Sequence, residues 1–120
     1  MKPNIAGVHH VALCVADVPE ALTFYVDVMG CSLRADRPDF GFPGAWLDAG
    51  PQQIHLMAFG DPERSMSHFA LQVDNIDAWC EHFDARSVAY QRSPHTPGAG
   101  QQVFLHDPAG NQLELNQPDH

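Results

Sequence analysis

The chain contains the same short motif twice. Residues 10–15 read His-Val-Ala-Leu-Cys-Val and residues 68–73 read His-Phe-Ala-Leu-Gln-Val, so His, Ala, Leu and Val recur in order 58 residues later. A second match lies at nearly the same offset, where residues 48–56 align with residues 107–115 and His55 falls opposite Glu114. Repetition at one spacing indicates copies of a single supersecondary unit. The sequence therefore predicts two related modules, joined at a turn-rich linker near residues 60–65.

Both modules are predicted to contain a strand, a helix and three more strands. Apolar residues alternate with other residues in the repeated motif, which is typical of a strand. Asp17 and Pro19 mark the start of the first helix, Gly30 its end, and Asn75 the start of the second. Between Pro19 and Gly30, five residues follow a helical apolar stripe, namely Ala21, Phe24, Tyr25, Val28 and Met29. The remaining strands are expected at residues 32–37, 45–47, 54–57, 88–91, 102–106 and 112–116.

Length and charge limit the class of protein. A chain of 120 residues with 44% hydrophobic and 18% charged side chains is expected to form one globular domain over residues 1–120. Six Lys and Arg against 15 Asp and Glu give a net charge of −9 without a basic stripe, so a nucleic-acid partner is not expected.

Cellular location is also constrained by the residue pattern. No apolar run approaches the roughly 20 residues of a membrane-spanning helix, and the first residues do not begin a secretory signal, so a cytoplasmic protein without a membrane partner is expected. The three cysteines, Cys14, Cys31 and Cys80, lack a CxxC spacing and fit reduced thiols.

Four repeat-related side chains are candidate metal ligands. Residues two apart on a strand share a face, so His10 and His68 lie opposite the apolar residues of their strands. On the last strand of each module, His55 and Glu114 likewise lie opposite the apolar residues. If the helices cover the apolar faces, these four residues point to the uncovered faces. Three imidazoles and a carboxylate predict a site for Zn, Ni, Co, Fe or Mn.

A single strand histidine is more often a hydrogen-bonded residue than a ligand. The repeat register is what favours ligation at the four positions above. The histidines outside that register are expected to be structural, solvated or pocket-lining: His9, His82, His95, His106 and His120. Cys14 shares the face of His10 and is interpreted as pocket lining rather than as a nucleophile.

These residues carry a resemblance over nearly the whole chain. The matching segments are residues 8–17, 24–30, 67–71 and 107–115. They resemble the vicinal oxygen chelate superfamily, which includes glyoxalase I, fosfomycin-resistance enzymes, extradiol dioxygenases and bleomycin-resistance binding proteins. The resemblance implies an α+β fold of two βαβββ modules, about residues 5–60 and 65–117, forming an incomplete barrel around a metal. It also implies a homodimer.

The resemblance implies a divalent-metal-dependent enzyme whose metal chelates a small oxygen-bearing substrate. A lyase or isomerase is expected, with Glu114 and His55 as catalytic residues. One alternative is an Fe(II) extradiol-type dioxygenase that uses His10, His68 and Glu114, and another is a non-catalytic small-molecule binding protein. Glyoxalase I typically has a carboxylate at the position of His55 and commonly an arginine at that of Cys14. The chain is therefore more similar to the glyoxalase-I-like proteins of plants and bacteria.

Overall fold

The computed structural model describes residues 3, 5–6, 8–58, 68–95 and 97–119. The chain forms two compact units, Met1–Asp61 and Pro62–His120, which are termed module one and module two. The linker expected at residues 60–65 lies outside the described residues, as do Ser67 and His120.

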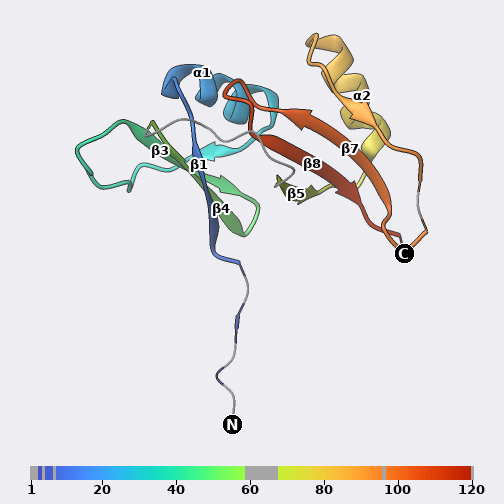
Figure 1. Cartoon of the computed structure of the whole chain (residues 1–120), viewed down its shortest axis with the longest axis horizontal. Helices are drawn as coiled ribbons and strands as arrows, with labels where there is room; N and C mark the ends of the chain where they lie inside the picture. Colours follow the sequence, from blue (N-terminus) through green and yellow to red (C-terminus); the bar gives the residue numbers. More distant parts are fainter. Residues whose placement is uncertain (1–2, 4, 7, 59–67, 96, 120) are drawn as a thin grey trace. The chain divides into compact units, whose positions relative to one another are not determined.

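The two modules have the same order of elements (Figure 1). Module one consists of β1 (His10–Cys14), α1 (Val18–Leu22), η1 (Thr23–Val28), β2 (Ser32–Leu33), β3 (Gly44–Ala49) and β4 (Gln52–Met57). Module two consists of β5 (His68–Gln72), α2 (Ile76–Ala85), β6 (Gln91–Arg92), β7 (Gln101–His106) and β8 (Gln112–Gln117). The predicted α+β fold of two βαβββ modules is confirmed. Among the described residues, no helix is long and apolar enough to cross a membrane.

Each module builds an open sheet of four strands with the same pairing. The strand orders are β1-β4-β3-β2 and β5-β8-β7-β6, and only the β1–β4 and β5–β8 pairs are parallel. His10 lies opposite Gln53 in one sheet and His68 opposite Gln112 in the other. The repeat seen in the sequence is therefore a repeat of strand register.

Side-chain caps begin both helices where the sequence predicts. The Asp17 carboxylate accepts a hydrogen bond from the Glu20 backbone N–H at 2.9 Å, and the Asn75 side chain accepts one from the Ala78 N–H at 3.1 Å. These bonds satisfy backbone donors that the first helical turn leaves without a partner.

The first helix changes its winding after α1. The η1 segment is a π-helix, in which the Met29 N–H donates to the Phe24 carbonyl at 2.9 Å. Phe24, Tyr25 and Met29 are all buried. The wider turn is found where these large side chains enter the core together, a feature that the regular helical spacing in the sequence does not indicate.

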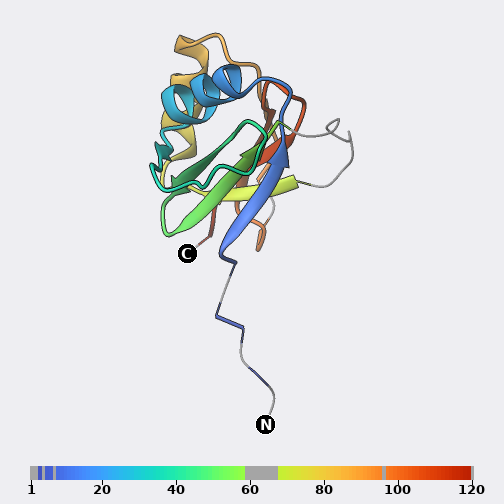
Figure 2. The same ribbon diagram turned by 90° about the vertical axis from the view of Figure 1, so that its left-hand side faces the viewer.

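The core of each module lies between its helix and one face of its sheet. In module one Leu47, Ile54 and Leu56 are at most 2% exposed, and in module two Val103, Leu105, Leu113 and Leu115 are equally buried. Figure 2 looks toward module one and shows its blue helix lying against the strands. The alternate residues of the same strands therefore occupy the sheet face away from the helix.

The edge strands β2 and β6 are shorter than predicted. After β2, the Arg34 N–H still donates to the Trp46 carbonyl at 2.8 Å, but pairing then ends and Pro38 lacks a donor N–H. Before β6, the Val88 N–H donates to the Phe83 carbonyl at 2.9 Å, so this residue closes the end of α2 instead of joining the sheet.

One buried carboxylate organises the turn between β7 and β8. Asp107 is 4% exposed. Its Oδ1 accepts hydrogen bonds from the backbone N–H groups of Ala109 at 2.9 Å and Asn111 at 2.8 Å, and its Oδ2 accepts from the Asn111 side chain at 2.8 Å. These bonds hold the turn that sets the β7–β8 register, and with it the position of Glu114 on β8.

Replacing this carboxylate is expected to destabilise module two. Asp107→Ala should lower the free energy of unfolding by about 2–4 kcal/mol, because two backbone donors at a part-buried turn lose a charged acceptor. Urea unfolding followed by circular dichroism measures the change. Asp39→Ala is the control, since Asp39 accepts a hydrogen bond from the Gly41 N–H in an exposed loop, and its replacement should cost less than about 1 kcal/mol. Equal losses in the two variants would contradict the role of Asp107.

Candidate metal centre

Each module contributes one pair of the predicted ligands on adjacent, parallel strands. His10 on β1 is beside His55 on β4 in module one, and His68 on β5 is beside Glu114 on β8 in module two. Their apolar neighbours on β4 and β8 are buried on the helix side of the sheets. The structure thus puts each pair on the sheet face away from its helix.

In module one the pair consists of stacked imidazoles. The His10 and His55 ring centroids lie 3.9 Å apart with 15° between the ring planes, and the other face of His55 stacks on Trp46 at 4.4 Å and 11°. His55 Nε2 lies 2.9 Å from Gln53 Oε1. His9 Nδ1 lies 2.9 Å from His10 Nδ1, which requires one ring to donate and the other to accept. His9 therefore orients His10, a role that its sequence position outside the repeat did not suggest.

The surroundings of His55 favour its neutral form. Burial lowers the pKa of His55 below its ordinary value, and the positive charge that His10, His9 and Arg34 can carry lowers it further, while Asp36 opposes the shift. A neutral imidazole has a lone pair, which is what both metal binding and proton acceptance require.

In module two the pair consists of an imidazole and a buried carboxylate. Glu114 is 6% exposed, and its Oε1 lies 3.0 Å from His68 Nε2. Its Oε2 accepts hydrogen bonds from Gln102 Nε2 at 3.1 Å and Asn116 Nδ2 at 2.9 Å. Both carboxylate oxygens are thus engaged, which is what a buried negative charge requires.

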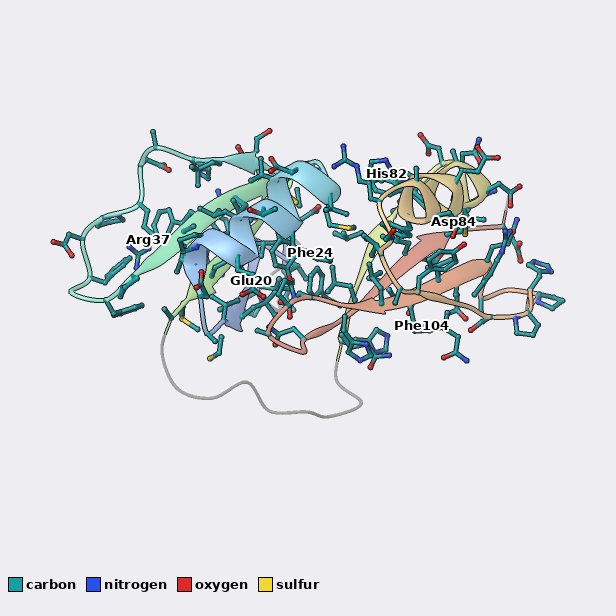
Figure 3. The ribbon with its side chains drawn as sticks, turned by 90° about the horizontal axis from the view of Figure 1, so that it is seen from above. Glu20, Phe24, Arg37, His82, Asp84 and Phe104 are labelled. Atoms are coloured by element: carbon teal, nitrogen blue, oxygen red, sulfur yellow. The ribbon has the colours of Figure 1, made fainter. Side chains whose placement is uncertain are left out.

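Gln102 is a site residue that the sequence did not single out. Strand alternation could have identified it. Gln102 is two residues from Phe104 on β7, and Asn116 is two residues from Glu114 on β8, so each shares a strand face with a residue of the site. Figure 3 marks Phe104, whose ring lies edge-on to His68 with a centroid distance of 5.8 Å. The surface of module two around Glu114 is therefore built from amides and one aromatic ring.

The pair in module two has donor types that suit a divalent ion, an imidazole nitrogen and a carboxylate oxygen. The His68 Nε2 and Glu114 Oε1 atoms lie 3.0 Å apart, at hydrogen-bond distance. In the part of the chain that the structure describes, no three His, Cys, Asp or Glu side chains form a metal-binding cluster. Each module thus holds one pair of the candidate ligands.

The remaining histidines lie in other environments. His82 is on α2, where Figure 3 labels it, and its ring lies edge-on to Trp79. His95 Nε2 lies 2.8 Å from an Asp119 carboxylate oxygen. His106 is exposed at the end of β7. Cys14 is half-buried at the end of β1.

Comparisons with known proteins converge on one family. The sequence profile described as "Glyoxalase/Bleomycin resistance protein/Dioxygenase superfamily" matches residues 7–115. "Glyoxylase I 4" of Arabidopsis thaliana is 27% identical over 93% of this chain and 71% of its own length. A lactoylglutathione lyase of Salmonella typhimurium strain LT2 is 27% identical over 88% of each chain.

A solved structure extends the similarity to a protein with a different described role. The antibiotic-binding protein TnmS3 from Streptomyces sp. CB03234 superposes with a TM-score of 0.85 and is 30% identical. The match covers 98% of this chain and 100% of that one. The chain is thus similar both to a named lyase and to a named binding protein.

His55 is expected to titrate below the ordinary histidine pKa of about 6.5. The unfolded chain then takes up a proton at higher pH than the folded chain, so the free energy of unfolding should fall as the pH drops from about 6.5 through the folded-state pKa. NMR titration of the His55 Cε1–H signal in metal-free protein measures this pKa, and His55→Gln assigns the signal. A value at or above the ordinary one would show that burial and the neighbouring imidazoles do not act as described.

Proposed function

Because the chain belongs to the Glyoxalase/Bleomycin resistance protein/Dioxygenase superfamily, we propose that it is a divalent-metal-dependent lyase or isomerase acting on a small oxygen-bearing substrate. The observation that carries this proposal is the contact between His68 and the buried Glu114 carboxylate, two side chains of metal-binding type on adjacent strands. The lactoylglutathione lyase name of its relatives supports the reaction class.

The proposed ligands are His10, His55, His68 and Glu114. They are the repeat-related candidate donors of the two modules, and imidazole and carboxylate together suit Zn, Ni, Co, Fe or Mn. When bound, the ion would supply Lewis-acid stabilisation of negative charge on the substrate oxygens.

Glu114 is proposed to move the proton. The Gln102 and Asn116 amides both donate to Oε2, so they hold the carboxylate plane and leave Oε1 as the oxygen nearest His68. Proton transfer by a carboxylate oriented in this way is worth about 10²–10⁴ in rate.

His55 is proposed either to complete the ligand set or to act as a second acid or base. Its lowered pKa keeps the ring neutral at pH 7, and Trp46 and His10 restrict the rotation of the ring by stacking on its two faces. Either role needs a neutral ring that is held in one orientation.

The second candidate is a protein that binds a small molecule without turnover. The 30% identity to an antibiotic-binding protein favours it. One experiment separates the two candidates: purified protein with and without added metal is incubated with a panel of small hydroxy-carbonyl compounds, aliphatic and aromatic, neutral and anionic. Metal-dependent conversion supports the enzyme, whereas recovery of unchanged, bound compound both with and without metal supports the binding protein.

The protein is expected to bind about one divalent ion per chain after dialysis against Zn, Ni, Co, Fe(II) or Mn, as measured by elemental analysis. His10→Gln and His68→Gln should each weaken binding by more than about tenfold, because each removes one donor. His82→Gln, on α2, is the matched control and should leave the ion bound. A folded protein that retains none of these ions would contradict the metal proposal.

Glu114→Gln is expected to lower metal-dependent turnover by about 100-fold or more while the far-ultraviolet circular dichroism stays unchanged. The amide keeps the shape of the side chain and an acceptor for Gln102 and Asn116, but it cannot carry the proton or the negative charge. Glu81→Gln, at an exposed position of α2, removes the same charge away from the site and is the matched control. Full turnover in Glu114→Gln would assign proton transfer to another residue.

A further inference from the structure

Five aromatic side chains of module one form a continuous row, termed here the aromatic ladder: Phe42, Phe40, Trp46, His55 and His10. The Phe40 centroid lies 6.1 Å from those of both Phe42 and Trp46. Trp46 on β3 is directly opposite His55 in the antiparallel register with β4. The row therefore runs from the loop before β3 to the proposed ligands on β4 and β1.

Arg37 holds the loop end of the aromatic ladder in place. Its guanidinium carbon lies 5.1 Å from the Phe40 ring centroid and 5.4 Å from that of Phe42, and its Nη2 donates to the Phe42 carbonyl at 3.0 Å. Gly44 leaves room for this arrangement, since a Cβ there would lie 2.7 Å from Arg37 Nη2. Figure 3 marks Arg37 within this loop.

The loop end of the aromatic ladder is exposed to solvent, although its contacts with Arg37 and the neighbouring rings hold it in place. Phe40 is 51% exposed and Trp46 is half-buried. A large aromatic side chain that is fixed by a cation and by neighbouring rings, yet left accessible, presents a rigid apolar surface to a ligand.

The charges near the aromatic ladder disfavour an anionic ligand. Arg34 forms ion pairs of 2.8 Å with both Asp36 and Asp48, and the Arg37 charge lies against the two phenylalanine rings. Both arginines that the structure describes in module one are thus engaged. The net charge of −9 over the chain adds a repulsive field for anions.

We propose that Phe40 and Trp46 bind a flat, aromatic, non-anionic ring of the small-molecule ligand. This inference rests on the proposed function, because His55 and His10 belong to both the aromatic ladder and the proposed ligand set. A ring stacked on Phe40 and Trp46 lies along the same row as the imidazoles. The ligand class is accordingly an aromatic compound without a negative charge on its ring.

The test uses three bicyclic probes with the whole protein in the presence of EDTA, so that it does not depend on a metal. The probes are 2-naphthol, decahydro-2-naphthol, which has the hydroxyl without the aromatic faces, and naphthalene-2-sulfonate, which is an anion. NMR titration follows the indole N–H signals of Trp46 and of Trp79 on α2. We expect 2-naphthol to shift the Trp46 signal and not that of Trp79, and the other two probes to bind at least about tenfold more weakly.

Variants assign the binding to the aromatic ladder. Trp46→Leu and Phe40→Leu should each weaken 2-naphthol binding about tenfold, whereas Trp79→Phe should leave it unchanged. Phe40 is exposed, so its variant remains informative if Trp46→Leu fails to fold. Equal affinity for the aromatic and saturated probes, or full affinity in Phe40→Leu, would overturn the inference.

The metal proposal and the aromatic-binding proposal can be tested independently of each other. If the aromatic ladder is correct, His68→Gln binds 2-naphthol as the wild type does, whatever its effect on metal. Loss of metal binding with retained naphthol binding would overturn only the metal proposal, and the reverse result would overturn only the aromatic site.

Discussion

The parallel pairing of the first and last strands of each module is the constraint on which the rest of the structure depends. It is extended by backbone hydrogen bonds just outside the strands, from Gln53 N–H to His9 carbonyl at 3.0 Å and from Val15 N–H to Met57 carbonyl at 2.9 Å. Parallel neighbours need a crossover, which the helix supplies. The helix then buries one face of the sheet, and the other face is left for polar side chains. Without this pairing, His10 and His55 would not be neighbours.

The two modules use one backbone plan for two kinds of chemistry. Module one surrounds its pair with aromatic rings, so His55 is kept neutral and stacked. Module two surrounds its pair with amides, which satisfy a buried carboxylate at Glu114. The two modules thus share their strand register and differ in the side chains on their open faces.

Sequence reasoning reached the fold because repetition and alternation are local signals. The repeated His at positions 10 and 68 located the parallel strands, and alternation placed Glu114 opposite the buried leucines. The π-winding of η1 could not be predicted, since it depends on how Phe24, Tyr25 and Met29 pack together. The Gln102–Glu114 bond was missed because it needs the β7–β8 register, and the spacing of residues along the chain does not supply that register.

The strand order of each sheet also has a consequence for motion. β4 and β8 are hydrogen-bonded on both sides within their modules, whereas β1 and β5 each lie at an edge of their own sheet. Amide hydrogens on the inner strands should exchange most slowly with solvent, and those at the edges sooner. His55 and Glu114 are therefore anchored to slowly exchanging backbone, while His10 and His68 are on the more compliant strands. In the metal centre that we propose, each module would therefore supply one donor from a fixed strand and one from an adjustable edge strand.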